Sequence, residues 1–136
     1  MSGEIVATLI FIALAVHEGS IGRRLAFRTK GTFESAGLAY DDAGGIVAQE
    51  FGVYSIGIAL AYLVAALDPA RYWGVAMMGI AINLSAGAMH FLRSSGIYFG
   101  NARPLFSADF ERKAGLGHAA ALVALFALLP RVGLVS

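Results

Sequence analysis

Four long apolar segments constrain the fold of this chain more strongly than any other feature of the sequence. They run from about residue 2 to 18, 44 to 67, 71 to 92 and 116 to 135. Each is close to the roughly 20 mostly apolar residues with which an α-helix crosses the hydrocarbon core of a bilayer. We therefore expect an all-α integral membrane protein, in which residues 1–136 form a single transmembrane domain built as a four-helix bundle.

The composition agrees with a membrane protein. Hydrophobic residues make up 58% of the chain and charged residues only 14%, and the mean hydropathy is +0.72, whereas globular domains are about half apolar and about a quarter charged. The net charge is +1 and the basic residues are interspersed with acids, which excludes the concentrated positive charge of a nucleic-acid-binding surface. The chain has no cysteine, which excludes disulfides, thiolate metal ligands and cysteine nucleophiles.

The distribution of basic residues predicts how the segments are oriented. Two long connections, residues 19–43 and 93–114, fall on one side of the membrane if all four segments cross it, and a tight turn at residues 67–71 falls on the other. The long connections hold eight of the ten lysines and arginines, and only Arg71 and Arg131 lie elsewhere. Because these residues favour the cytoplasmic side, we expect both long loops in the cytoplasm. Both termini then lie outside it, in a protein of a prokaryotic plasma membrane.

The ends of the fourth segment carry signals of their own. Ser107 followed by Asp109 and Glu111 is typical of a helix N-cap with acidic residues in the first turn, so we expect a helix to begin near Ala108. At the other end, Pro130 is expected to bend or end the helix, because proline lacks the amide hydrogen that a helix interior requires.

Ionisable residues gather at the cytoplasmic end of all four segments. The first segment ends at His17 and Glu18, and the second begins with Glu50. The third ends with His90, and the fourth begins with His118. A charged group inside a bilayer costs several kcal/mol unless it is paired or hydrated. We therefore predict a polar pocket inside the bundle. Glu50 and His90 are expected at its centre, and Glu18 and His118 at its rim.

Helical spacing adds neighbours to these residues. Side chains three or four positions apart share a helix face, so Tyr54 is placed beside Glu50. Asn83 is placed on the face of His90, in a stripe of small residues of the kind that marks packed interfaces between membrane helices. We accordingly predict catalytic roles for Glu50, His90 and Glu18. Contacts to a substrate are predicted for Tyr54, Asn83, His118 and His17.

The two long connections are rich in apolar side chains. Apolar and basic residues interleave over residues 21–28, which predicts a short helix lying in the headgroup region. Residues 93–114 contain many aromatic side chains, including Tyr98 and Phe106, and interfacial aromatics usually lie at the headgroup level. We expect this second connection to fold back as a lid over the pocket, with Tyr98 and Phe106 in contact with the substrate. Simple anchoring of the loop in the membrane is the alternative.

Three kinds of chemistry suit a buried cluster of glutamate and histidine. The first and preferred one is acid–base chemistry on a small lipophilic substrate that enters from the bilayer, with Glu50 and His90 transferring protons. The second is binding of a metal or another small ligand, because imidazole and carboxylate ligate zinc, iron, manganese or copper. The paired Glu-x-x-His motifs of di-iron bundles are missing, however. The third is a proton-coupled carrier, for which a homo-oligomer would have to complete a continuous polar path.

A purely structural role is the remaining alternative. Glu50 could form an ion pair with Arg24 or Arg93, and the protein could be an accessory subunit held together by its polar cluster. The chain has none of the sequence motifs of serine hydrolases, P-loop proteins or zinc proteases. The residues alone therefore leave open whether the protein is an enzyme and which metal or cofactor it binds. Its expected partners are the lipid bilayer and a small lipophilic molecule, and a second copy of the chain is a further candidate.

Two stretches of the chain are similar to a known group of membrane proteins. The segments IVAQEFGVYSIGIALAYLVAALDP (46–69) and INLSAGAMHF (82–91) resemble the DoxX-like family of small four-span membrane proteins and related uncharacterised families. The shared features lie in residues 46–91: a glutamate that opens the second span, a short turn with proline, and a Gly/Ala-His pattern that closes the third. The resemblance implies a four-helix membrane bundle. It implies no settled activity, because some members are linked to redox or quinone pathways and others are poorly characterised.

Overall fold

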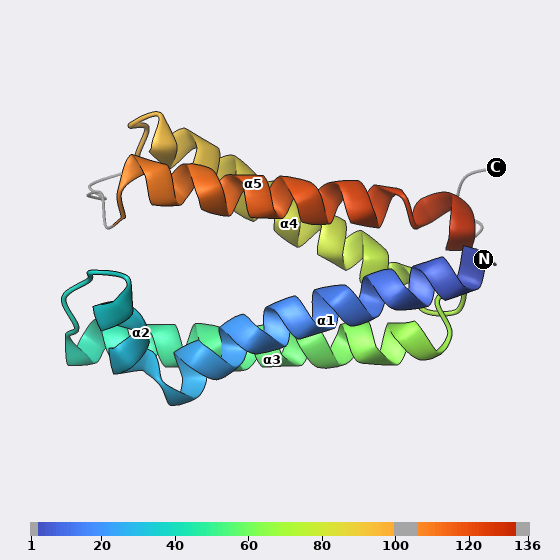
Figure 1. Ribbon diagram of the computed structural model, residues 1–136, viewed down its shortest axis with the longest axis horizontal. Helices are drawn as coiled ribbons and strands as arrows, with labels where there is room; N and C mark the ends of the chain where they lie inside the picture. Colours follow the sequence, from blue (N-terminus) through green and yellow to red (C-terminus); the bar gives the residue numbers. More distant parts are fainter. Residues whose placement is uncertain (1–2, 100–105, 133–136) are drawn as a thin grey trace. The chain divides into compact units, whose positions relative to one another are not determined.

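The computed structural model describes residues 3–99 and 106–132. Within these ranges the protein is entirely helical, with five α-helices and one short 3₁₀ helix (Figure 1). The helices are α1 (Gly3–Phe27), α2 (Thr29–Ser35), α3 (Asp42–Leu67), α4 (Trp73–Ser94), α5 (Ala108–Phe126) and η1 (Leu129–Val132). The predicted all-α class is therefore confirmed.

Three of the helices, α1, α3 and α4, are long and apolar enough to cross a membrane. The shortest of them, α4, has 22 residues, and at about 1.5 Å per residue it exceeds the roughly 30 Å of a hydrocarbon core. These helices support an integral membrane protein. Helix α5 corresponds to the fourth predicted span and is not among the three. Its first turns carry four charged residues, Asp109, Glu111, Arg112 and Lys113.

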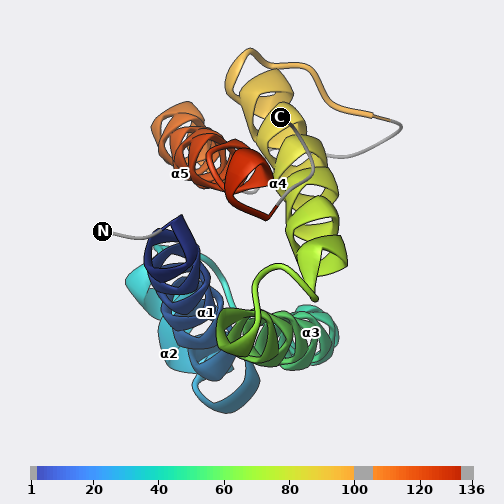
Figure 2. The ribbon, with the colours of Figure 1, turned by 90° about the vertical axis from the view of Figure 1, so that its right-hand side faces the viewer.

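The chain divides into two compact units, Met1–Tyr72 and Trp73–Ser136. The first unit holds α1, α2 and α3, and the second holds α4, α5 and η1. In each unit two long helices run antiparallel and side by side, α1 with α3 and α4 with α5 (Figure 2). Each unit therefore has a packed seam of its own, and the two seams are built from different residues.

Small residues line the contact between α1 and α3. On α3, small buried residues recur at intervals of seven positions: Gly45, Gly52, Ala59 and Ala66. On α1 the same interval separates Thr8, Ala15 and Gly22. Such residues let two helix backbones approach closely, and a seven-residue repeat keeps them on the side of the helix that faces its partner. Between them, the rings of Phe11 and Tyr62 are 0% and 1% exposed, with their centroids 6.0 Å apart.

Two contacts fix how α1 lies along α3. The Thr8 hydroxyl donates a hydrogen bond to the Ala66 carbonyl oxygen at 3.1 Å. Towards the other end of the seam, Gly22 and Gly52 face each other. A Cβ built on Gly22 would lie 2.7 Å from the Gly52 carbonyl oxygen, and one built on Gly52 would lie 2.9 Å from the Gly22 carbonyl oxygen. No side chain fits between the two backbones there.

Helix α1 continues past the predicted end of the first span. Residues 21–27 form its last turns, so the headgroup helix expected over residues 21–28 is not a separate element. The chain leaves the helix at Arg28, whose φ is −137° and ψ 36°, and α2 follows. The helix persists because Gly22, which would weaken an isolated helix, is packed against α3.

Glycines with positive φ follow α2 and α4. Gly37 and Gly96 have φ of 71° and 79°, in a region that residues with a side chain rarely adopt. After α4, the amide of Ile97 donates to the carbonyl of Leu92 at 3.0 Å, and the amide of Gly96 also bonds back to the last turn. This Schellman arrangement closes the end of the helix that carries His90.

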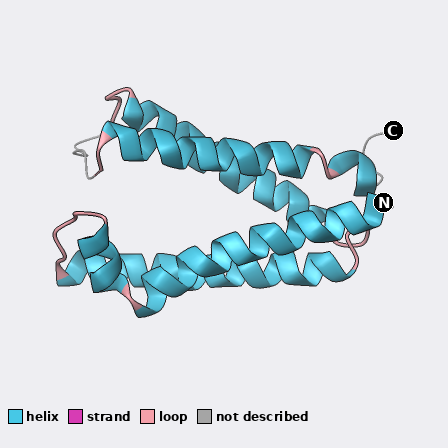
Figure 3. Ribbon diagram, viewed as in Figure 1, coloured by secondary structure: helices cyan, strands magenta, loops and turns pink. Residues whose placement is uncertain are grey.

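Helix α5 follows a loop (Figure 3) and begins where its sequence predicts. The Ser107 hydroxyl accepts a hydrogen bond from the amide of Phe110 at 3.2 Å, so the expected start near Ala108 is confirmed. The helix ends at Phe126, and Pro130 lies beyond it in η1. Proline therefore follows the helix instead of bending it.

We expect Gly52→Ala to lower the free energy of unfolding by about 1–3 kcal/mol, because the added methyl group overpacks a contact between two backbones. Unfolding of the purified protein in detergent, followed by circular dichroism, measures the change. Gly57→Ala is the matched control, since Gly57 lies on the same helix and a Cβ there meets nothing within 4 Å. Alanine favours a helix over glycine by about 1 kcal/mol, so the control should be at least as stable as the unaltered protein. Equal stability of the two variants would contradict the close contact.

Candidate functional site

A partly buried hydrogen bond joins α4 to α5. The Nδ1 atom of His90 lies 2.5 Å from Oε2 of Glu111. The glutamate side chain is only 2% exposed, and the histidine side chain is 21% exposed. A buried carboxylate is costly without a partner, and the imidazole supplies that partner. His90, which the sequence places at the centre of a polar pocket, is therefore held by a glutamate from the first turn of α5.

A second polar pair lies beside the first. The Nδ1 atom of His118 lies 2.8 Å from Oδ1 of Asn83, and Nδ2 of Asn83 donates to the Gly79 carbonyl oxygen at 2.9 Å. Because that carbonyl can only accept, the amide nitrogen must face it, and the amide oxygen then faces His118. The Nδ1–H group of His118 is therefore the donor. Asn83 is 3% exposed, so both contacts are made inside the packed seam.

The imidazole rings join the two pairs into one network. The rings of His90 and His118 are stacked, with 5.4 Å between centroids and an interplanar angle of 15°. Four side chains form this α4–α5 network, two from each helix: Asn83, His90, Glu111 and His118. Three of the four are predicted site residues, and the structure brings them together. Glu111 is the member that the sequence interpretation misses.

The two helices carry the same short motif. Residues 83–90 read NLSAGAMH and residues 111–118 read ERKAGLGH. Each has a polar acceptor, an Ala-Gly pair three and four positions later, and a histidine seven positions after the acceptor. Because the helices are antiparallel, the acceptor of each motif meets the histidine of the other. The network therefore has a local twofold pseudosymmetry.

The central glycine of each motif lets the helices meet at this distance. A Cβ built on Gly87 would lie 3.1 Å from the Cβ of His118, and one built on Gly115 would lie 3.2 Å from the ring of Phe91. A larger residue at either position would push the helices apart and lengthen the hydrogen bonds of both histidines. Gly117, by contrast, has nothing within 4 Å of a Cβ built on it.

Glu111 escapes the sequence interpretation because a simpler explanation fits its position. An acid in the first turn of a helix interacts favourably with the helix dipole, and no further role is needed to explain it. The signal that could have identified it is the spacing of seven residues to His118, with Gly115 between them. The same spacing separates Asn83 from His90 around Gly87.

Asp109 shows how an ordinary first-turn acid behaves. Its carboxylate lies 2.6 Å from Nζ of Lys113, and both side chains are largely exposed. The hydrogen bond from Lys113, together with the charge of that lysine, lowers the pKa of Asp109. Exposed pairs of this kind contribute little to stability. Asp109 is therefore a suitable control for Glu111.

The other predicted polar residues lie in the first unit. His17 is exposed and Glu18 is partly buried on α1, whereas Glu50 is exposed on α3. Tyr54, also on α3, is 70% exposed. The structure brings together the predicted residues of α4 and α5, and the proposed pairing of Glu50 with His90 stays a prediction.

Residues 3–99 and 106–132 bear on two alternative roles, an ion pair of Glu50 and a metal site. In this part of the chain no ion pair within 4.0 Å links Glu50 to Arg24, and a pairing of Glu50 with Arg93 stays a prediction. The same residues contain no group of three or more His, Cys, Asp or Glu side chains arranged to hold a metal ion.

The second long connection is described only at its two ends. The Tyr98 hydroxyl donates a hydrogen bond to the Arg93 carbonyl oxygen at 3.3 Å, and the ring of Phe106 stacks on that of Phe110 with 4.4 Å between centroids. Residues 100–105 lie outside the described residues. The lid, and the contacts of Tyr98 and Phe106 with a substrate, stay predictions.

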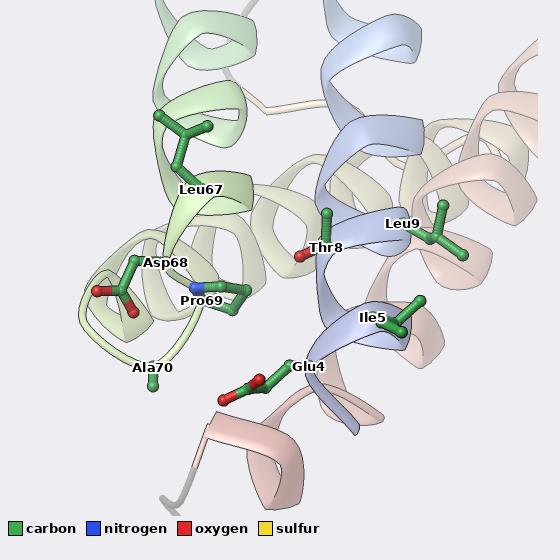
Figure 4. Close-up of a pocket in the computed structure, with 8 residues that line it drawn as sticks. All are labelled: Glu4, Ile5, Thr8, Leu9, Leu67, Asp68, Pro69 and Ala70. Atoms are coloured by element: carbon green, nitrogen blue, oxygen red, sulfur yellow. The ribbon is translucent and has the colours of Figure 1, made fainter. Parts of the chain in front are cut away.

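A surface pocket lies in the first unit between the start of α1 and the turn after α3 (Figure 4). Its lining includes two carboxylates, Glu4 and Asp68, among aliphatic side chains. Asp68 already accepts a hydrogen bond from the amide of Arg71 at 3.1 Å, which stabilises the turn. None of the predicted site residues lines this pocket.

Comparisons of the chain with protein-family models, with curated proteins and with solved structures find no match. The resemblance of residues 46–91 to DoxX-like proteins accordingly stays a prediction.

We expect Glu111→Ala to lower the free energy of unfolding by about 1–3 kcal/mol, because the variant leaves the partly buried Nδ1–H group of His90 without its acceptor. Equilibrium unfolding of the purified protein in detergent measures this loss. Asp109→Ala removes an exposed carboxylate two residues earlier and should leave the stability nearly unchanged. If the two variants unfold alike, the buried pair between α4 and α5 does not exist.

Proposed function

We propose that this protein is a small integral membrane protein that carries out acid–base chemistry on a small lipophilic molecule at the α4–α5 network. The observation that carries the proposal is the 2.5 Å hydrogen bond between Nδ1 of His90 and the buried carboxylate of Glu111. A lipophilic substrate suits the site because α4 is long and apolar enough to cross a membrane. A molecule dissolved in the bilayer can then reach this helix without passing through water.

Glu111 supports the role of His90 as a base by orienting its imidazole. An ionised carboxylate only accepts hydrogen bonds, so Nδ1–H is the donor and the neutral ring carries its lone pair on Nε2. When Nε2 takes a proton from the substrate, the adjacent carboxylate stabilises the imidazolium that forms. The imidazolium exchanges its N–H proton with the medium and then returns a proton to another atom of the substrate. A base positioned in this way contributes typically about 10²–10⁴-fold to a reaction rate.

The two histidines have different partners and therefore different roles. Asn83 orients His118 as Glu111 orients His90, but a neutral amide balances no positive charge. Of the two rings, His90 is therefore the one with a carboxylate beside it to balance the charge of an imidazolium. His118 instead positions the polar end of the substrate next to the base.

We also propose that α5 is a fourth membrane span and that the four long helices form a bundle in a prokaryotic plasma membrane. In support, residues 114–130 contain no aspartate, glutamate, lysine or arginine. The concentration of lysine and arginine in the two long connections favours a cytoplasmic position for both of them and an external position for the termini.

Single cysteines test this orientation, since the chain has no cysteine of its own. We expect Ala70→Cys, in the turn between α3 and α4, to react with a membrane-impermeant maleimide in intact cells. Ser35→Cys and Ser95→Cys, in the two long connections, should react only after the cells are permeabilised. All three positions are exposed in the structure. The opposite labelling pattern would show that the topology is inverted.

Deuterium incorporation tests the proposed chemistry without knowledge of the substrate. Proteoliposomes are incubated in D₂O with a lipid extract of the host cells, and mass spectrometry searches for a compound that gains deuterium or isomerises. A base that removes a proton from carbon and returns one from the medium should produce such a compound. We expect His90→Ala to reduce the rate by about 10²–10⁴-fold.

Asp109→Asn is the matched control and should keep the full rate of deuterium incorporation. The absence of any labelled or isomerised compound with the unaltered protein would contradict the proposal. Stoichiometric zinc, iron or copper in the purified protein, lost in His90→Ala, would instead indicate metal binding. Proton flux across the liposome membrane would instead indicate a carrier.

A further inference from the structure

We propose that the C-terminal end of α1 binds the phosphate-bearing headgroups of anionic phospholipids. Three exposed arginines lie within six consecutive residues there: Arg23, Arg24 and Arg28. Phe27 lies among them and is 76% exposed. This arginine surface is separate from the α4–α5 network and does not depend on the function proposed for that network.

The length of α1 places the arginine surface at the depth of the lipid phosphates. A helix rises about 1.5 Å per residue, so the roughly 30 Å of a hydrocarbon core takes about 20 residues to cross. Counted from Glu4 in the first turn of α1, this length reaches Arg23 and Arg24. Phe27 follows directly, and aromatic side chains favour this interfacial layer.

The guanidinium groups are available because other side chains satisfy the end of the helix. Basic residues near a helix C-terminus commonly bind its last carbonyls. At the end of α1, the hydroxyls of two threonines from α2 take this role. Thr29 donates to the carbonyl four residues earlier at 2.5 Å, and Thr32 donates to those of Arg24 and Arg28 at 3.1 and 2.8 Å. Of the three arginine side chains, Arg24 makes one backbone hydrogen bond, from Nε to the Ser20 carbonyl.

Nearby acids do not neutralise the arginine surface. Within the described parts of the chain, none of its three arginines forms an ion pair within 4.0 Å. Glu34 faces Lys30 instead, at 4.0 Å, and Asp41 accepts a backbone hydrogen bond as the N-cap of α3. Asp42 and Glu50 lie at the same end of α3 and make no ion pair with the arginines.

The chemistry of the surface favours a lipid over a soluble phosphate. A guanidinium group binds phosphate through two parallel hydrogen bonds, which either source could accept. Phe27 distinguishes them, because an aromatic ring that is three-quarters exposed needs an apolar neighbour. The glycerol and acyl region of a phospholipid provides one directly beneath its phosphate, and a free phosphate ion does not.

A single fluorophore can report on lipids at this surface. Trp73 is the only tryptophan of the chain, so Trp73→Phe combined with Phe27→Trp places one indole beside the arginines. In vesicles, quenching by brominated phosphatidylglycerol is compared with quenching by brominated phosphatidylcholine. We expect the anionic lipid to be preferred at least about fivefold. Raising the salt concentration to about 1 M should remove most of this preference, because the Debye length falls to about 3 Å.

Variants of the reporter protein identify the residues responsible. Replacing Arg23, Arg24 and Arg28 together by glutamine should reduce the preference to about onefold, whereas replacing all three by lysine should retain most of it. Lys30→Gln is the matched control, because this ammonium group already faces a glutamate, and it should keep the preference. The salt titration needs no substitution of the arginines and so does not depend on how the variants fold.

Several outcomes would overturn the proposal. Equal quenching by the two lipids with all three arginines present would exclude an anionic-lipid surface. A preference that survives the glutamine substitutions, or that is lost equally in Lys30→Gln, would show that these arginines are not its source. In a last experiment, inorganic phosphate is added at constant ionic strength and the lipid preference is measured again. If phosphate removed the preference and chloride did not, the arginines would prefer free phosphate to the lipid, against the proposal.

Discussion

The burial of one carboxylate, that of Glu111, sets the arrangement of α4 and α5. A charge taken out of water costs several kcal/mol unless its partner is close and well oriented. Helix α5 must therefore present Glu111 within reach of Nδ1 of His90, and the observed separation is 2.5 Å. Glycines in the seam make this separation possible. The four side chains share one seam, so a change that moves either helix affects all of them.

The motif repeated on α4 and α5 places His90 and His118 at equivalent helix positions. Their partners differ, because His90 pairs with a carboxylate and His118 with an amide. Two carboxylates in this seam would bring two buried negative charges close together, and two amides would leave a protonated imidazole without a counter-ion. One carboxylate and one amide give the network a single negative charge. That carboxylate is the counter-ion for one imidazolium, which suits a site whose task is to accept and return one proton.

Local sequence signals predict the positions of the helices well, but they predict the side-chain contacts between helices less well. Apolar length, the Ser107 cap and the position of Pro130 all act within a few residues, so the helices can be placed from sequence. The apolar run of α1 stops at Val16, yet the helix extends to Phe27 because packing against α3 continues. Glu111 escapes the sequence interpretation because its partner, His90, depends on how α4 and α5 align.

The seven-residue repeat of small residues on α1 and α3 does not by itself define a single alignment of the two helices. Sliding one helix by seven residues, about 10 Å, would again set glycine and alanine against small residues. The side chains between the small residues remove this degeneracy. Phe11 now lies against the buried ring of Tyr62, and a slide in either direction would replace it with Glu4 or Glu18. A carboxylate pressed against a buried ring is costly, so these two glutamates select one alignment among those that the small residues alone would allow.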